Sequence, residues 1–180
     1  MVTIKQEIRT SGTSLMKNKL CEVVIKPSNS GEIRIFSKGA DVGFEAIIDN
    51  LYDLVKELNI DHVVAVESRG YLLGAPLAYK LNAGLVIVRK PGKLPSKVER
   101  VEYGLEYGTD ALEIHSDAIK DGEKVLVVDD LLATGGTVNA TISLVEKLGA
   151  QVAGCLFLIE LEGLSQKSQI NSRIISLIKC

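Results

Sequence analysis

Four short apolar runs, rich in β-branched residues, recur along the chain from residue 62 onward, and stretches of helical periodicity alternate with them. Continuous apolar runs of this length are typical of strands that are covered on both faces, as in a parallel sheet. The alternating stretches place apolar residues on one stripe of a helix. This order predicts a doubly wound α/β fold. The expected strands are residues 62–67, 85–89, 124–130 and 152–161, and the expected helices are residues 44–58, 70–81 and 137–148.

Size and charge narrow the classes of function. The 180 residues are enough for one domain with one main core. A net charge of −2 disfavours binding to nucleic acid by general phosphate attraction, although a small basic pocket for a phosphorylated metabolite remains compatible with it. No apolar segment reaches the roughly 20 residues of a membrane helix, and residues 1–20 lack the apolar block of a signal peptide. We therefore expect a cytoplasmic protein without nucleic-acid or membrane partners.

The cysteines give no sign of a metal site. Cys21, Cys155 and Cys180 are an odd number and form no C-x-x-C pair, and the chain has 2 histidines. A cage of cysteine and histidine ligands is therefore nearly excluded. We interpret the three cysteines as small hydrophobic residues of a reduced, cytoplasmic protein.

Two stretches do not follow the alternation. Residues 90–109 contain two prolines, three glycines and many charges, and a connection this long within a compact domain is usually functional or mobile. Near the N-terminus, residues 22–26 and 32–36 alternate in the manner of strands on either side of PSNSG. This pattern predicts a hairpin with a five-residue loop, outside the main sheet.

The segment VLVVDDLLATGGT, residues 125–137, carries the strongest functional signal. An apolar strand ends in Asp129 and Asp130, and Thr-Gly-Gly-Thr then opens a helix. Glycines let the backbone approach a ligand closely. The helix N-terminus forms an anion site, to which Thr134 and Thr137 add hydroxyl donors. The acids lie at the carboxyl end of a strand, where open α/β sheets bind ligands. Beside an anion site, acids are suited to binding sugar hydroxyls rather than the phosphate. The alternative is a tight turn whose threonines cap the helix.

Two other expected strands also end in polar residues. Ser68, Arg69 and Gly70 follow one strand and open a helix, which offers a second place for an anion. Arg89 and Lys90 end another strand at the same edge of the sheet. Taken alone, each segment has a simpler interpretation. The first is an ordinary turn in which Arg69 is solvated, and the second is a solvated basic pair on the surface. Together with the acid pair, two anion sites and a basic pair fit a sugar that carries separated phosphates.

These segments resemble the type I phosphoribosyltransferase family. VLVVDDLLATGGT is similar to its motif for phosphoribosyl pyrophosphate (PRPP), and ESRGYLLGAPLA, VIVRKPGKLP and LEYGTDALEIH resemble, in order and spacing, segments of its adenine-specific branch. The resemblance covers roughly residues 44–161. It implies a mostly parallel central sheet flanked by helices, with a small N-terminal hood. Residues 1–180 would form one domain, with an atypical hood in 1–43, the core in 44–161 and a tail with a strand in 162–180.

The resemblance implies roles for the residues at matching positions. Asp129 and Asp130 would hold the ribose 2′- and 3′-hydroxyls. Glu106 would handle the proton on the base from a flexible closing loop that also carries Tyr107. From composition alone, Glu106 is an ordinary solvated carboxylate, and the match to LEYGTDALEI distinguishes it. The residues implied for the 5′-phosphate are Ala133, Thr134, Gly135, Gly136 and Thr137. Those implied for the pyrophosphate are Glu67, Ser68, Arg69, Gly70, Arg89, Lys90 and Lys93.

The implied reaction is purine salvage, in which PRPP and adenine give AMP and pyrophosphate. The implied cofactor is Mg²⁺, held by substrate and water with no direct protein ligand. Enzymes of this group are typically dimers, so the resemblance also implies a homodimer. Residues 71–81 and 85–90 are our candidates for an interface in which one patch meets its own copy.

The sequence departs from the family in the segment that recognises the base. Adenine-specific enzymes usually carry F-P-x-P-G-I-x-F-x-D, and the nearest stretch here, KPSNSGEIRIFSK, has different spacing and lacks the acid. Phe36 is a candidate to stack on a purine, and the alternative is that it packs the hairpin onto the core. Two other functions therefore stay open. One is a transferase for hypoxanthine, guanine or xanthine, and the other is a PRPP-sensing regulator on the same fold.

Overall fold

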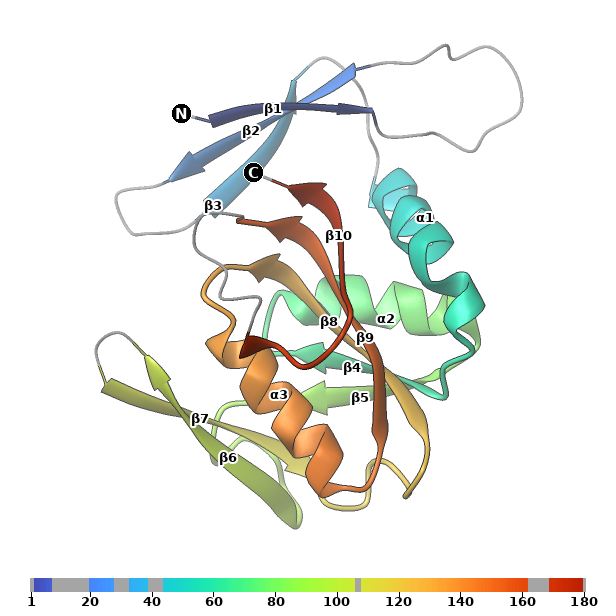
Figure 1. The fold of residues 1–180 in the computed structure, drawn as a ribbon, viewed down its shortest axis with the longest axis vertical. Coiled ribbons are helices and arrows are strands. Elements are labelled where there is room, and N and C mark those ends of the chain that lie inside the picture. The colour runs from blue at the N-terminus through green and yellow to red at the C-terminus, as the bar shows by residue number, and fades with distance from the viewer. Residues whose placement is uncertain are drawn as a thin grey trace.

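The structure is a computed structural model of the chain, and it describes residues 2–7, 20–27, 33–38, 44–105, 108–161 and 169–179. A five-stranded sheet forms its centre (Figure 1). Its strand order is β10-β9-β8-β4-β5, and every neighbouring pair is parallel. The predicted strands are confirmed with shifts of one or two residues at their ends. The strands are β4 His62–Val66, β5 Gly84–Val88, β8 Lys124–Leu132, β9 Gln151–Glu160 and β10 Ile174–Lys179.

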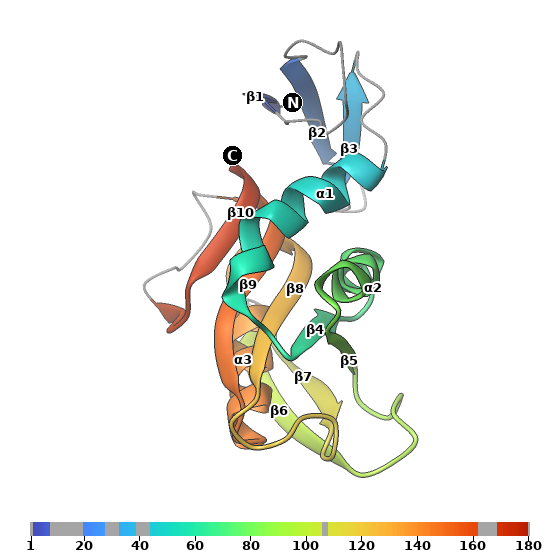
Figure 2. The same cartoon turned by 90° about the vertical axis from the view of Figure 1, so that its right-hand side faces the viewer.

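Helices cover both faces of this sheet, as the turned view in Figure 2 shows. On one face lie α1 (Phe44–Val55) and α2 (Gly70–Leu81), and on the other lies α3 (Gly136–Lys147). Alternate residues of β8 divide the core, because side chains of a strand point to opposite faces. Val127 packs in the cluster that includes α3, whereas Leu126 packs in the cluster that includes α1 and α2. The doubly wound arrangement predicted from the apolar runs is confirmed.

Helix ends follow local sequence. The first predicted helix is shorter than expected, because α1 ends at Val55 and continues as a 3₁₀ turn, η1 (Lys56–Leu58). After α3, Gly149 adopts a φ of +81°, a left-handed conformation that favours glycine. No helix in the described ranges is long and apolar enough to cross a membrane.

The second half of the stretch expected to be a long connection contributes to a β-hairpin. Strands β6 (Val98–Leu105) and β7 (Gly108–His115) pair antiparallel. Val101 and Tyr103 pack against the core on the α3 side, while Arg100 and Glu102, which alternate with them, are exposed. This period of two is a strand pattern, and the many charges of the segment concealed it. A bridge between Arg89 and Glu113 ties the hairpin to the end of β5.

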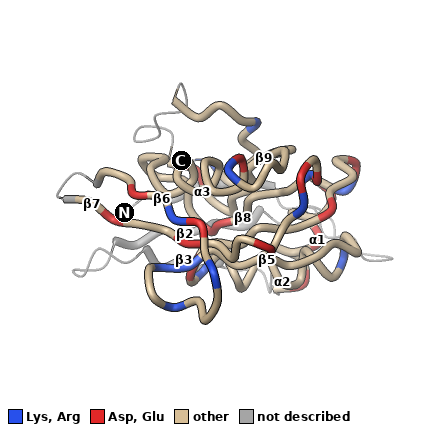
Figure 3. Tube along the Cα trace, turned by 90° about the horizontal axis from the view of Figure 1, so that it is seen from below, with Lys and Arg blue, Asp and Glu red and all other residues tan. Residues whose placement is uncertain are grey.

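The N-terminal segment forms a separate antiparallel sheet of β1 (Val2–Glu7), β2 (Leu20–Pro27) and β3 (Ile33–Lys38). The predicted hairpin is confirmed in β2 and β3, outside the main sheet, and β1 adds a strand that the sequence did not predict. Figure 1 shows this sheet beyond the ends of β9 and β10. Lys and Arg are interspersed with Asp and Glu along the described part of the trace (Figure 3).

Candidate active site

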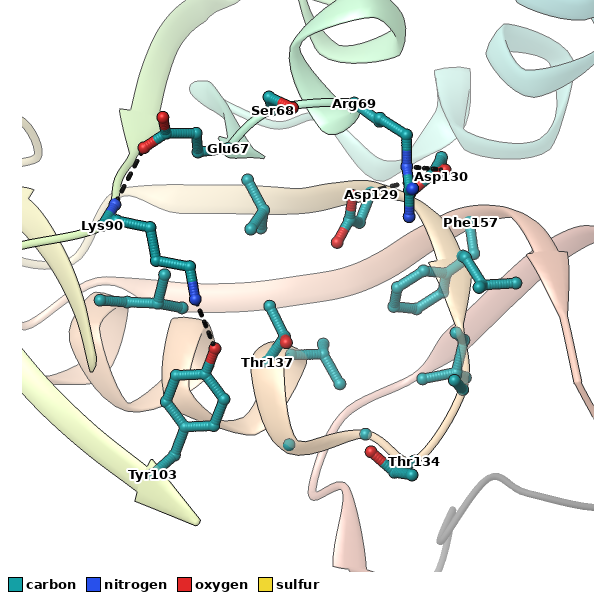
Figure 4. A pocket seen from close by; sticks show the side chains of 18 residues that line it. Glu67, Ser68, Arg69, Lys90, Tyr103, Asp129, Asp130, Thr134, Thr137 and Phe157 are labelled. Atoms are coloured by element: carbon teal, nitrogen blue, oxygen red, sulfur yellow. Dashed lines mark hydrogen bonds and ion pairs between the residues drawn. The ribbon is translucent and has the colours of Figure 1, made fainter. Parts of the chain in front are cut away.

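A cavity of about 580 Å³ opens at the carboxyl ends of β4 and β8. Two segments supply most of its wall: the end of β4, and the end of β8 with the following turn (Figure 4). Separate residues from beyond β5, from the β6–β7 hairpin and from β9 complete it. Its position agrees with the rule that open α/β sheets bind ligands at this edge. The polar lining residues are Glu67, Ser68, Arg69, Lys90, Tyr103, Asp129, Asp130, Thr134 and Thr137.

One wall is the β8–α3 turn, residues 133–137. Gly135 has a φ of +96°, which an L side chain rarely adopts, and Gly136 is the first residue of α3. All five residues of the turn line the cavity, and Figure 4 shows Thr134 and Thr137 along it. The N-terminus of α3 therefore lies at the cavity wall, where its backbone N–H groups and dipole favour an anion.

The acid pair lies at the end of β8, beside this turn. Burial, together with the neighbouring charge of Asp130, raises the pKa of Asp129 to about 7. Asp130 is also half-buried, and the Nε of Arg69 lies 2.5 Å from its Oδ2. The carboxylates are thus held by different means. Asp129 is half-buried beside a second carboxylate, whereas Asp130 is paired with a cation next to the start of α2.

The end of β4 places a second carboxylate in a basic setting. Glu67 accepts hydrogen bonds from Lys93 Nζ at 2.6 Å and the Lys90 backbone N–H at 2.9 Å, with Arg89 at 3.4 Å. Burial alone would raise the pKa of Glu67, but these donors outweigh it and lower the pKa to about 2. Glu67 therefore stays ionised, and its charge compensates Arg89 and Lys93.

Across the cavity from the acid pair lies a group that we call the lysine cluster: Lys90, Tyr103 and Asp110. Lys90 Nζ donates hydrogen bonds to Asp110 Oδ2 and, at 3.3 Å, to the Tyr103 hydroxyl. That hydroxyl in turn donates to Asp110 Oδ2 at 3.2 Å. The lysine cluster joins the segment after β5 to both strands of the hairpin.

Comparison with known proteins gives this site its family. The phosphoribosyl transferase domain matches residues 41–179. Over 139 residues the chain is 55% identical to the adenine phosphoribosyltransferase of Crocosphaera subtropica. The matched region covers 76% of this chain and 81% of the relative. This chain belongs to the adenine phosphoribosyltransferase family. The resemblance of the sequence motifs to the adenine-specific branch is thereby confirmed.

Solved structures of the adenine phosphoribosyltransferase family share the fold. The enzyme from Thermoanaerobacter pseudethanolicus superposes with a TM-score of 0.78 at 45% identity, covering 88% of this chain and 95% of that one. The enzyme from Saccharomyces cerevisiae, solved with an imino-altritol bisphosphate and adenine, superposes with a TM-score of 0.75 at 36% identity, covering 86% and 93%. The fold class predicted from the sequence is confirmed.

The structure brings most of the expected site residues of this family member to one cavity, but not all of them. Gly70, Arg89 and Lys93 are absent from the lining. Gly70 instead packs so closely on β8 that a Cβ there would lie 2.7 Å from the Val128 carbonyl oxygen. Arg89 and Lys93 face Glu67. Among the expected cations, Arg69 and Lys90 are the ones that line the cavity.

Some expectations fall on parts of the chain that the structure does not describe. Glu106 and Tyr107 lie outside the described residues, as does the side chain of Phe36. Cys180 is also outside them, and Cys155 is fully buried, with a pKa raised to about 11 by that burial. In the described ranges, no group of three or more His, Cys, Asp and Glu side chains is placed to hold a metal ion.

Sequence reasoning missed several residues of the cavity wall. Tyr103 and the apolar residues Leu112 and Phe157 line it, and Asp110 stands behind it in the lysine cluster. Tyr103 had a readable signal, because it shares the inward register of Val101 on β6. Asp110 had none, because its partner lies 20 residues earlier in the chain.

Proposed function

We propose that this cavity is where the chain transfers the phosphoribosyl group of PRPP to adenine, giving AMP and pyrophosphate in purine salvage. One observation carries this assignment to the cavity. An anion-binding turn directly follows two carboxylates at the end of a central strand, in a chain of the adenine phosphoribosyltransferase family. An anion site beside hydroxyl-binding acids suits a sugar phosphate better than a free phosphate or a nucleobase alone.

The β8–α3 turn holds the 5′-phosphate in this proposal. Its backbone N–H groups and the hydroxyls of Thr134 and Thr137 donate to the phosphate oxygens. Asp129 and Asp130 accept hydrogen bonds from the ribose 2′- and 3′-hydroxyls. Binding frees Asp130 from its ion pair with Arg69, so that the guanidinium is available to the pyrophosphate.

Two cations of the cavity wall stabilise the departing pyrophosphate in this proposal. Breaking the bond between ribose C1 and the pyrophosphate oxygen builds positive charge on the sugar and negative charge on the leaving group. Arg69 and Lys90, with donors from Ser68, face that negative charge. Arg89 and Lys93 act indirectly here, since they compensate the charge of Glu67.

The donor set fits Mg²⁺ that is held mainly by substrate. Mg²⁺ prefers oxygen ligands and keeps several waters. The cavity offers the carboxylates of Asp129 and Asp130, while its third acid, Glu67, is paired with Arg89 and Lys93. No group of three acids or histidines in the described residues is placed to hold the ion directly. These two side chains would hold the ion through ribose hydroxyls and water. Bound Mg²⁺ would partly neutralise the pyrophosphate.

In this proposal, residues of the hairpin and of the N-terminal sheet bind the base and take its proton. Glu106 takes the N9 proton of adenine as the glycosidic bond forms, and Tyr107 lies next to it in the closing segment. Phe36 stacks on the purine ring. The hairpin supports this arrangement, because its strands β6 and β7 bring residues 105 and 108 to the same end of the ladder. Closure of the segment over the cavity would exclude water, which would otherwise hydrolyse the activated sugar.

We also propose a homodimer formed by α2 and the edge strand β5. Leu72, Tyr79 and Leu85 are 66%, 88% and 45% exposed, a concentration of large apolar side chains on one side of the fold. An isologous interface would cover this patch in both subunits. Sedimentation at micromolar concentration should show a species of twice 19.4 kDa, and a species of 19.4 kDa alone would contradict the dimer.

The reaction is tested by a spectrophotometric screen of adenine, hypoxanthine, guanine and xanthine, each with PRPP and Mg²⁺. We expect AMP formation from adenine with the highest kcat/KM of the four. The 55% identity to an adenine phosphoribosyltransferase favours adenine over the other bases. A clear preference for another purine would overturn the base assignment, and no product from any of the four would overturn the reaction.

A further inference from the structure

Lys90 is held at both ends by carboxylates that come from different parts of the fold. Its backbone N–H donates to Glu67 Oε2 at 2.9 Å, and its ammonium donates to Asp110 Oδ2. The Tyr103 hydroxyl closes a triangle with these two groups, accepting from Lys90 and donating to Asp110. A lysine has many rotamers and is costly to immobilise, so this number of constraints calls for an explanation.

Asp110 is itself fixed and lies behind the cavity wall. Its Oδ1 accepts the backbone N–H of Ala111 at 2.8 Å, which leaves Oδ2 directed at Lys90 and Tyr103. Lys90 and Tyr103 line the cavity, whereas Asp110 does not. The side chain of Asp110 is 27% exposed, so its charge is only partly screened. An ion pair of this kind outside a site would be ordinary, but here one partner lines the cavity.

The other cations near the cavity differ from Lys90 in their surroundings. Arg89 and Lys93 share Glu67 and stay outside the lining, and Arg69 pairs with Asp130, which itself lines the cavity. Arg69 and Lys90 both line the cavity, but their carboxylate partners differ. The partner of Arg69 lines the cavity as well, whereas the partner of the Lys90 ammonium, Asp110, does not. A substrate can therefore displace Arg69 from its acid, but it meets the Lys90 ammonium while Asp110 still holds it.

We propose that Asp110 is a positioning residue which, with the Tyr103 hydroxyl, fixes the Lys90 ammonium where negative charge develops on the leaving pyrophosphate. This inference rests on the proposed function. Because Asp110 and Tyr103 belong to the two strands of the hairpin, the same contacts connect the pyrophosphate end of the cavity to the strands that carry Glu106. Preorganised charge assists the transition state more than the ground state.

Asp110→Asn tests the proposal through a split between kcat and KM. We expect kcat for AMP formation to fall about tenfold, because the amide cannot hold the ammonium as a carboxylate does. The KM for PRPP should change less than about threefold, since a released Lys90 still attracts the anionic substrate. Asp110→Glu should recover part of the loss, and Tyr103→Phe should give a smaller loss of the same kind.

A double-mutant cycle with Lys90→Ala shows whether Asp110 acts through the lysine. Asp110→Asn should have no further effect in the Lys90→Ala background. Glu102→Gln is the matched control, because Glu102 pairs in register with Ala111 on the same hairpin but is exposed and faces Arg100. It should keep wild-type kinetics.

A readout that does not depend on turnover is acetylation of Lys90, followed by mass spectrometry. Burial lowers the pKa of Lys90, but the hydrogen bonds from it to Asp110 and Tyr103 outweigh this and raise the pKa overall. Asp110→Asn should therefore make Lys90 several-fold more reactive, while Glu102→Gln leaves it unchanged. If the wild type forms no AMP, the proposed function is overturned. The labelling of Lys90 would still show whether Asp110 holds its ammonium in place.

Three results would overturn the positioning role. One is wild-type kcat and wild-type Lys90 labelling in Asp110→Asn. Another is a full additional loss of kcat when Asp110→Asn is added to Lys90→Ala. The last is a rise in KM for both substrates together with a lower melting temperature, which indicates a structural role only.

Discussion

The two walls of the cavity are built in different ways. The β8–α3 turn is one continuous stretch of chain, in which backbone N–H groups and two glycines shape the surface. The lysine cluster, whose Tyr103 lies next to Gly136 of this turn, is assembled from side chains of three separate segments that are held by hydrogen bonds. A backbone site depends on local conformation, whereas a side-chain site depends on long-range contacts. We therefore expect the β8–α3 turn to determine the affinity for PRPP, and the lysine cluster with its hairpin to determine kcat.

The largest expected effect comes from Glu106, on the hairpin side. Glu106→Gln keeps the shape and hydrogen bonding of the side chain but cannot exchange a proton. It should lower kcat by roughly 10²–10⁴-fold, the usual contribution of general acid–base catalysis. Calorimetry should find PRPP affinity almost unchanged, which would sharpen the contrast between the two walls.

Glu102→Gln, four residues earlier on the same hairpin, is the control for this prediction. Its carboxylate is exposed and pairs with Arg100, so the variant should stay close to the wild type. Activity lost in the Glu102 variant and kept in the Glu106 variant would show that the acid–base residue has been misplaced.

Gly136→Val tests the wall made of backbone. The added side chain would block close approach of the 5′-phosphate, and each charged hydrogen bond lost is worth about 1.5–3 kcal/mol. PRPP affinity should therefore fall about 10- to 100-fold or more, while circular dichroism shows a folded protein. Gly136 is a better probe than Gly135, because its φ is not left-handed and a Cβ would meet only ordinary contacts.

Gly104→Val is the matched control for that variant, because a Cβ at Gly104 would enter open space and Gly104 does not line the cavity. It should bind PRPP as the wild type does. Equal PRPP affinity in Gly136→Val and Gly104→Val would remove the β8–α3 turn from the phosphate site.

Phe36→Ala asks whether the N-terminal sheet takes part in binding the base. Stacking of a base on an aromatic ring is worth about 1–3 kcal/mol. The KM for adenine should rise about ten- to a hundredfold, with a much smaller change for PRPP. Equal effects on both substrates would indicate that Phe36 only packs the hairpin.

The smallest expected effect is on stability, at Asp129. The folded-state pKa is about 7, against an ordinary value of 3.8, so between these values the folded protein binds a proton more tightly than the unfolded chain. This group therefore makes the free energy of unfolding fall as pH rises through that window. Asp129→Asn removes the buried charge, so the variant should melt several degrees above the wild type at alkaline pH.

The advantage of Asp129→Asn should shrink as the pH approaches 3.8. PRPP affinity should fall in the same variant, since an amide is a weaker acceptor for the ribose hydroxyls. A melting temperature below that of the wild type at every pH would show that Asp129 stabilises the fold, which is the opposite of this account.

The same difference between the walls explains what the sequence could predict. Asp129 to Thr137 lie together in the chain, and their spacing alone placed an anion site and an acid pair at the end of a strand. The central strands were predictable for a similar reason, because burial on both faces demands unbroken apolar runs. Local pattern is sufficient wherever the backbone itself makes the structure.

The rest depended on partners that are distant in sequence. Arg89 and Lys93 look like free cations until the fold brings Glu67 between them. Tyr103 lay in a stretch interpreted as a long, functional or mobile connection, although β6 alternates inward and outward residues as strands do. Asp110 follows that stretch directly. β10 is another example, since a strand in the tail was expected, but its parallel pairing with β9 at the sheet edge could not be read from residues 174–179.

A crystal structure with AMP and pyrophosphate tests the central claim most directly. The account predicts the AMP phosphate on the backbone of residues 133–137 and the ribose hydroxyls on Asp129 and Asp130. Pyrophosphate should lie beside Ser68, Arg69 and Lys90, with Lys90 still bound to Asp110. An AMP phosphate found away from the β8–α3 turn, or ribose hydroxyls that do not reach the acid pair, would contradict it.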